Sequence, residues 1–115
     1  MAEVKLLADK VNNDRRLAYW LDMQNGDVGE PADWAYLPDN TATAYGHPWG
    51  SGGSVSLFGS NDGNNWHQLF KTDHTMPCTW TQDNMIIILE RPRFIRPQVT
   101  AGDGNTLIDV HIMFR

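Results

Sequence analysis

Disulfides, basic runs and long apolar runs are scarce or missing in this sequence. Cys78 is the only cysteine, so no disulfide can form within the chain. The net charge is −5 and there is no Lys/Arg-rich run. The densest basic group, Arg91, Arg93 and Arg96, is too small to neutralise a track of phosphates, as nucleic-acid binders do. No apolar segment approaches the roughly 20 residues that span a membrane. We therefore expect no nucleic-acid partner, no membrane partner and a fold that depends on packing.

The amino-terminal residues also lack the pattern of a secretion signal. Residues 1–9 contain no basic region followed by a long apolar one, so we expect a protein made in the cytoplasm. The apolar residues of 1–14 fit helical spacing and strand alternation equally well. The sequence thus predicts an N-terminal arm or edge element over 1–14 and a single β-sandwich domain over 15–115.

Turn-forming residues and tryptophan are abundant. The 115 residues include ten glycines, six prolines and five tryptophans. Glycine, proline, asparagine and aspartate between short alternating runs are typical of a protein with many short strands. The clearest case is residues 54–70, where two alternating runs flank Asp62-Gly63. An Asp-Gly pair tolerates the positive φ angles of a tight turn, so this stretch predicts a hairpin.

Alternation predicts further strands over 15–23, 41–45, 78–81, 85–89, 93–100 and 106–114. Residues 24–33 and 46–53 are expected to be loops because they are rich in glycine and proline. Residues 85–89 are apolar throughout, which suits a strand buried on both faces. Pro97 gives no N–H to a ladder, so its strand should lie at an edge or carry a bulge. The predicted core consists of Leu17, Tyr19, Leu21, Val55, Leu57, Trp66, Ile86, Ile88, Ile95, Val99, Ile108, Val110 and Ile112.

Seven or eight such strands predict an all-β fold. The architecture we expect is a two-layer antiparallel β-sandwich with jelly-roll-like connections and a short N-terminal arm. A small barrel is the alternative.

The sequence offers no catalytic or metal-binding pattern. The four histidines, His47, His67, His74 and His111, are scattered and none has a zinc-site spacing relative to another. Residues 61–65 are rich in Asn and Asp but do not have the spacing of an EF-hand loop, and turn formation accounts for them. We therefore expect no enzyme activity, no catalytic residue, no metal and no cofactor.

Aromatic residues are more numerous than a core of this size requires. Surplus Trp and Tyr in loops are typical of contact surfaces and of sugar-binding platforms. They could also fill the ends of the sandwich as minor core. The residues we select for contact with a partner are Trp20, Trp34, Tyr36, Tyr45, Trp49 and Trp80.

Two phrases carry a resemblance to known families. Residues 54–66, SVSLFGSNDGNNW, resemble the central hairpin of discoidin-like β-sandwiches and of small structural proteins of tailed bacteriophages. Residues 93–97, RFIRP, begin the final pair of strands, and this pair resembles the closing strands of both groups. The Arg-Pro pair and the TAGDG turn are closer to the phage group. The resemblance covers roughly residues 54–115.

The resemblance to phage capsid decoration (cement) proteins implies a virion structural protein on the capsid surface. Its partner would be the major capsid protein, and it would form a homotrimer or another homo-oligomer. The alternative is a discoidin-like carbohydrate-binding module in a tail or fibre. The absence of a second cysteine departs from secreted discoidin modules, which are usually bridged.

Overall fold

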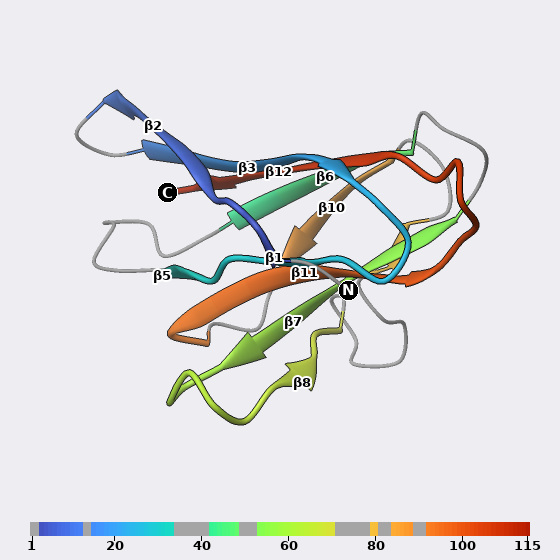
Figure 1. Cartoon of the computed structure of the whole chain (residues 1–115). Coiled ribbons are helices and arrows are strands. Elements are labelled where there is room, and N and C mark those ends of the chain that lie inside the picture. Colours follow the sequence, from blue (N-terminus) through green and yellow to red (C-terminus); the bar gives the residue numbers. More distant parts are fainter. Residues whose placement is uncertain are drawn as a thin grey trace.

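The chain is an all-β protein whose strands form two sheets packed face to face, as a computed structural model shows (Figure 1). The structure describes residues 3–12, 15–33, 42–48, 53–70, 79–80, 84–88 and 92–115, with the backbone alone for 9–12, 48, 79–80 and 84–87. Within these ranges no helix has the length and apolarity needed to cross a membrane. The predicted two-layer β-sandwich is confirmed.

One layer, sheet A, has the strand order β1-β4-β11-β7-β8, with β5 also paired to β11 and β9 to β7. All its pairings are antiparallel except that of β1 with β4, which is parallel. Its strands are β1 (Glu3–Val4), β4 (Val28–Gly29), β5 (Ala32–Asp33), β7 (Ser54–Ser60), β8 (His67–Gln68), β9 (Thr79–Trp80) and β11 (Phe94–Ala101).

The other layer, sheet B, has the order β10-β6-β12-β3-β2 and is antiparallel throughout its described part. Its strands are β2 (Leu7–Asn12), β3 (Arg15–Met23), β6 (Ala42–Pro48), β10 (Asn84–Ile88) and β12 (Ile108–Phe114). From β6 onward the chain crosses between the sheets repeatedly, since β7, β8, β9 and β11 belong to sheet A. This alternation gives the predicted jelly-roll-like connectivity.

The N-terminal segment contributes to both sheets. β1 ends the order of sheet A and β2 ends that of sheet B, so residues 3–12 form edge strands. Glu30 ties this segment down, because its N–H donates to the Val4 carbonyl at 2.8 Å and its carboxylate accepts from the Leu6 N–H at 3.2 Å. Of the two forms predicted for this segment, arm or edge element, the described residues adopt the second.

The core lies between the two sheets and contains most of the residues that alternation selected. Their side chains are all buried: Val55, Leu57, Ile88, Ile95, Val99, Ile108, Val110 and Ile112. Phe114 and Leu69 are buried with them. The Ile86 side chain lies outside the described residues.

The face of β3 is the opposite of the predicted one. Leu17, Tyr19 and Leu21 were expected inside, but Ala18 and Trp20 are the buried pair and Leu21 is 38% exposed. Both faces of this strand are apolar, so the alternation of hydrophobic residues does not specify which face turns inward. Trp20 decides it, because its large ring gains most from leaving water.

A β-bulge near the end of β3 then changes the parity. Trp20 is opposite Val110 and Met23 is opposite Ile108, so two residues of β3 face the single residue Asp109. Asp22 occupies the bulge with a φ of 57°, and its N–H donates to the Asp109 carboxylate at 2.9 Å. As a result Met23 points inward and is fully buried, although it has the same parity as Leu21.

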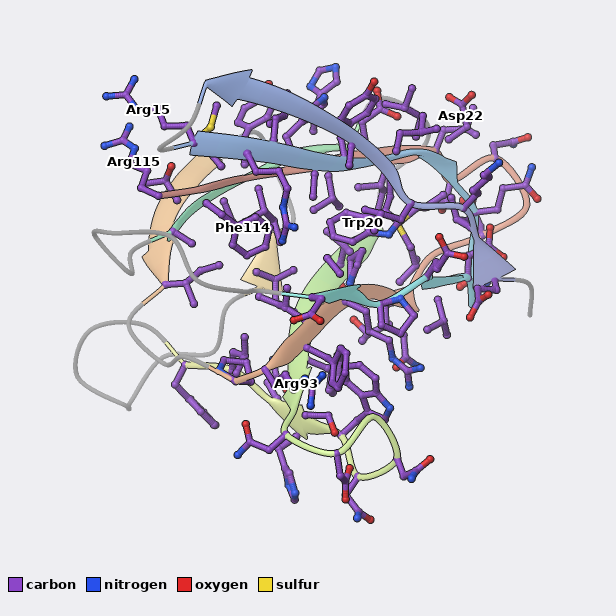
Figure 2. The ribbon with its side chains drawn as sticks, turned by 90° about the vertical axis from the view of Figure 1, so that its left-hand side faces the viewer. Arg15, Trp20, Asp22, Arg93, Phe114 and Arg115 are labelled. Carbon is purple, nitrogen blue, oxygen red and sulfur yellow. The ribbon has the colours of Figure 1, made fainter. Side chains whose placement is uncertain are left out.

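Trp20 joins the two sheets. Its indole Nε1–H donates to the Glu30 carbonyl at 2.9 Å, next to β4 of sheet A. A Cβ on Gly29 would lie 2.9 Å from the Trp20 ring and 2.6 Å from Pro97, so only glycine fits between them. Figure 2 shows Trp20 and Phe114 between the layers.

Pro97 lies inside β11 rather than at an outer edge of sheet A. It is opposite Leu57 of β7, with which it would exchange no hydrogen bonds. The Val99 N–H donates to the Asp27 carbonyl on the side of β11 away from β7. By alternation the nitrogen of Pro97 faces this side too. Here β11 pairs with β5 at Phe94 and Ile95 and with β4 at Gln98, so Pro97 lies in the gap between these two pairings and interrupts neither. The bulge of β11 lies later, between Val99 and Ala101.

Two expected loops contain strand residues. Residues 46–48 extend β6 because they pair with Ile108, Asp109 and Val110 of β12. Within 24–33, β4 and β5 each pair with β11. Residues 85–88 lie in β10, as predicted, at an edge of the described part of sheet B rather than in its centre.

The predicted hairpin forms, with a longer turn than two residues. Phe58 pairs with Gln68 and Gly59 with His67. Asp62 organises the turn, because its carboxylate accepts from the N–H groups of Asn64 and Asn65, each at 2.8 Å. The Asn65 and Asn64 N–H groups, with the Asn65 and Ser60 side chains, hold the pKa of Asp62 well below its usual range. Gly63 follows at a φ of 81°.

The bridge between the sheets can be tested by substituting Trp20. We expect Trp20→Ala to lower the free energy of unfolding by about 3–5 kcal/mol, because it removes a fully buried ring. Trp20→Phe should cost about 1–3 kcal/mol, since it leaves the Glu30 carbonyl without its donor. Urea denaturation measures both. Leu21→Ala is the control on the exposed face of the same strand. If Trp20→Ala lowered the free energy of unfolding by no more than Leu21→Ala does, the bridging role of Trp20 would be contradicted.

The turn of the hairpin can be tested at Gly63. Gly63→Ala should cost about 1–2 kcal/mol, because a side chain is strained at this positive φ. Gly104→Ala is the matched control: it also lies in a turn, its added Cβ would have no neighbour within 4 Å, and its φ is not in the left-handed region. Equal midpoints of urea denaturation for the two variants would refute the claim that the turn requires glycine at position 63.

Candidate functional site on the outer faces of the sandwich

The reversed face of β3 leaves sheet B with an apolar outer surface. Leu7 and Leu21, at 37% and 38% exposed, are the exposed large hydrophobic side chains among the described residues. Neighbouring strands add half-buried apolar and aromatic residues to the same side. We call this surface the B face; its members are Leu7, Leu17, Tyr19, Leu21, Tyr45, His47, His111 and Met113.

Pairing between the strands arranges the B face in rows. Tyr19 is opposite both Leu7 and His111, and His111 is opposite Tyr45, so these four form one row across β2, β3, β12 and β6. Met113 is opposite Leu17 in the next row. Cross-strand neighbours on one face have Cβ atoms about 5 Å apart, so each row is a continuous strip.

The rings of the B face stack on one another. The Tyr19 and His111 ring centroids are 5.6 Å apart with planes 15° from parallel. Tyr45 stacks on His47 at 6.2 Å and 10°, and is tilted by 45° against His111 at 6.0 Å. These contacts restrict the rotamers of the rings, so the side chains lose little conformational entropy when another molecule covers them.

His111 is the titratable group at the centre of this stack. Burial lowers the pKa of its imidazole, the Asp109 carboxylate opposes that shift, and His47 adds to it. The Nδ1 atom of His111 is buried and has no hydrogen-bond partner in the described part of the chain. The folded protein therefore favours the neutral ring.

Sheet A has an outer surface of a different kind, in which arginines cover aromatic rings. The Arg96 guanidinium lies 4.0 Å from the Trp66 ring centroid, and Arg96 is also opposite Phe58. The Arg93 guanidinium lies 4.9 Å from the Phe94 ring centroid. Both are cation–π contacts. We call this surface the A face; its members are Phe58, Trp66, Gln68, Arg93, Phe94 and Arg96.

Trp66 is a correction to the predicted core. It was expected inside, but it is half-buried on the A face beneath Arg96, while Leu69 packs inside. Burial lowers the pKa of the Arg96 guanidinium and Glu3 opposes the shift. Its Nε has no hydrogen-bond partner in the described ranges. Arg and Trp together are typical of the residues that dominate protein interfaces.

The six residues selected for contact have different positions. Trp20 is fully buried and cannot meet a partner, so this prediction was wrong: a ring of its size was most stable between the sheets. Tyr45 lies on the B face. Trp80 is in β9, with its side chain outside the described residues. Trp34, Tyr36 and Trp49 also lie outside them.

Sequence reasoning missed most of the B face and the A face. Tyr19 and Leu17 were placed in the core, and Arg96 was seen only as one of three nearby arginines. The sequence did contain one indication of the B face, which is that β3 has apolar residues on both of its faces. Only one face of such a strand can line the core of a two-layer sandwich, so the other is either exposed or covered by another molecule.

Metal binding finds no support in the described residues. No group of three or more His, Cys, Asp or Glu side chains there could hold a metal ion. In the Asn-rich turn, the Asp62 carboxylate oxygens accept hydrogen bonds from the turn itself.

No protein-family model and no curated protein matches the sequence. The fold is similar to that of the SPBc2 prophage-derived protein YomS, with a TM-score of 0.60 at 9% identity over 91% of this chain and 99% of that chain. It is also similar to a cupin domain from Bordetella pertussis Tohama I, with a TM-score of 0.50 at 9% identity over 99% of this chain and 95% of that chain. At these identities the likeness concerns the fold alone.

The state of His111 makes stability depend on pH. Its folded pKa is lowered, so the unfolded chain binds more protons as pH falls through the ordinary histidine pKa of about 6.5. Stability should therefore decrease on going from about pH 7 to pH 5, and His111→Gln should flatten this slope. Thermal melts across this range measure it, and His67→Gln is the control for removing one histidine from an exposed site. A His111→Gln slope equal to that of the unaltered chain would contradict the assignment.

Proposed function

We propose that this chain is a non-enzymatic structural protein of a phage virion, a decoration or cement protein. It binds the major capsid protein on the outer capsid surface and stabilises the joints between capsomers. It is made in the host cytoplasm and acts as a homotrimer or another homo-oligomer. It requires no cofactor, nucleic acid or membrane.

The observation that carries this proposal is the pair of apolar and aromatic outer faces on opposite sides of one sandwich. Sheet B exposes Leu7 and Leu21 beside stacked rings, and sheet A carries the half-buried rings of Trp66 and Phe94 against arginines. Contiguous apolar surface of this kind marks sites of protein contact. A module with two such faces can contact two neighbours at once, which is what bracing a shell requires.

The proposed mechanism needs only buried area and multiplicity. At about 25 cal/mol per Å² of apolar surface, contact with a few hundred Å² is favourable by several kcal/mol before the cost of association is subtracted. Contacts from several linked copies then reinforce one another through effective concentration. Weak individual contacts therefore become firm attachment.

The A face suits the capsid contact. The Arg96 guanidinium over Trp66 offers a planar group with several donors. A carboxylate or carbonyl on the capsid could satisfy such a donor while the ring buries apolar area.

Two further observations favour a phage protein. The hairpin phrase at residues 54–66 forms the hairpin that it predicts, and it resembles those of phage structural proteins. The SPBc2 prophage-derived protein YomS has a similar fold.

The alternative function is a discoidin-like carbohydrate-binding module. Tyr45 and Tyr19 present rings on a flat face, which could stack on sugars. A glycan array tests this directly, and binding that Trp34→Ala or Trp49→Ala abolishes would favour it over the capsid role.

The capsid role is tested by mixing the purified chain with empty capsids of the phage that encodes it. We expect co-sedimentation and a higher temperature of capsid disruption. Trp66→Ala should weaken binding by about 10- to 100-fold, because it removes a central ring from the contact. Gln98→Ala, on the same side of sheet A, is the control. No binding and no change in heat resistance would refute the proposal.

A further inference from the structure

We propose that the B face is the interface of a symmetric dimer, in which a second copy of this chain packs on it face to face with its strands running in the opposite direction. The proposed function leaves the number of copies in the oligomer open, and this inference specifies two copies related by a two-fold axis. It does not depend on capsid binding, because it concerns the other side of the sandwich.

On the central strand pair β3–β12 the middle of the B face is apolar, and Asp9 of β2 and Thr43 of β6 flank its Leu17–Met113 row. The Leu17–Met113 row and the Tyr19–His111 row lie in the middle of the strand pair β3–β12. Burial favours the neutral form of His111, so no formal charge from this residue would have to be desolvated. Two such surfaces can interdigitate as the inner faces of a β-sandwich do.

One end of the same strand pair is basic. The ladder between β3 and β12 ends at the pair Arg16 and Phe114, and Arg15 and Arg115 are the next residues beyond it. Phe114 points inward, so by alternation Arg15 and Arg115 are neighbours on the outer side. Figure 2 shows both at the same end of sheet B. Like charges in directly opposite positions repel. This end calls for an acidic group that the described chain does not supply.

The other end is acidic. The β3 bulge places Asp22 there, exposed, and its N–H binds the Asp109 carboxylate of β12. Figure 2 shows Asp22 at the opposite end of the sheet from Arg15 and Arg115. The B face thus has a basic end, an apolar centre and an acidic end along one strand direction.

A two-fold axis makes this pattern self-complementary. An axis in the plane of contact and perpendicular to the strands reverses the strand direction, so the basic end of each copy covers the acidic end of the other. The same operation places the apolar rows of the two copies on each other. An isologous interface requires this property: where residue i of one copy contacts residue j of the other, residue j of the first copy also contacts residue i of the second.

The area suits a reversible pair. The four strands that carry the B face lie about 4.8 Å apart and are about seven residues long, so the face covers roughly 450 Å² in projection. Side chains that project from it add accessible area, which places the contact at the small end of specific interfaces, at less than about 800 Å² per partner.

The molar mass of the purified full chain tests the proposal, by light scattering over a concentration series up to about 100 μM. We expect twice the monomer mass of 13.0 kDa, falling to the monomer as the protein is diluted. Leu17→Glu places a charge in the apolar centre and should weaken the dimer more than about 100-fold. Leu7→Glu, at a position 37% exposed, tests the same face with less risk to folding. Gln98→Glu adds the same charge to sheet A and should leave the dimer intact.

Charge exchange tests the orientation of the two copies. Arg15→Glu alone and Asp22→Lys alone should each weaken the dimer about 10-fold, and the double variant should recover to within about 3-fold of the unaltered chain. A monomer at every concentration, a trimer, a dimer insensitive to Leu17→Glu, or a double variant no better than the singles would overturn the proposal. Capsid binding by a monomeric chain would refute this inference alone, and a dimer that ignores capsids would refute the proposed function alone.

Discussion

The sandwich depends on the contact between Trp20 of sheet B and the Gly29–Glu30 segment of sheet A. The indole fills the space that a side chain on Gly29 would need, and its N–H satisfies the Glu30 carbonyl. Glu30 in turn holds the N-terminal strands through Val4 and Leu6. One buried ring therefore sets the distance between the layers, anchors the edge of sheet A and determines which face of β3 turns inward.

The outer surfaces follow from that choice. With Trp20 inside, Leu17, Tyr19 and Leu21 must face outward, and they join His111 and Tyr45 in the rows of the B face. The bulge at Asp22 then returns Met23 to the core and leaves an acidic group at the end of the face. The proposed interface is thus a consequence of core packing, since the residues that cannot enter the core form the surface that needs covering.

The two faces support different roles in the proposed virion protein. The A face combines arginine with aromatic rings, which suits recognition of polar groups on a different protein. The B face combines an apolar centre with opposite charges at its two ends, which suits a second copy of the same chain. Self-association through the B face leaves both A faces uncovered. Because the two-fold axis lies in the plane of contact, the two A faces point to opposite sides of the dimer, and each can bind a different neighbour.

Much of the fold was predictable from the sequence alone. Alternation in β12 and in β7 placed Ile108, Val110, Ile112, Val55 and Leu57 in the core, because the other face of each strand is mostly polar. The Asp-Gly pair predicted the central hairpin, since few residues other than Gly accept the φ of Gly63. These decisions are local: strand alternation and turn chemistry need no knowledge of the partner strand.

Only the tertiary structure decided the face of β3 and therefore the candidate site. Both faces of β3 are apolar, so the choice depended on which ring sheet A could accommodate opposite Gly29. The parity change at Asp22 depended on Asp109, which is 87 residues away in sequence. The same holds for Trp66, whose place on the A face is set by Arg96 of β11. Long-range register is invisible to local pattern, because it is fixed by contacts between strands that are distant in the chain.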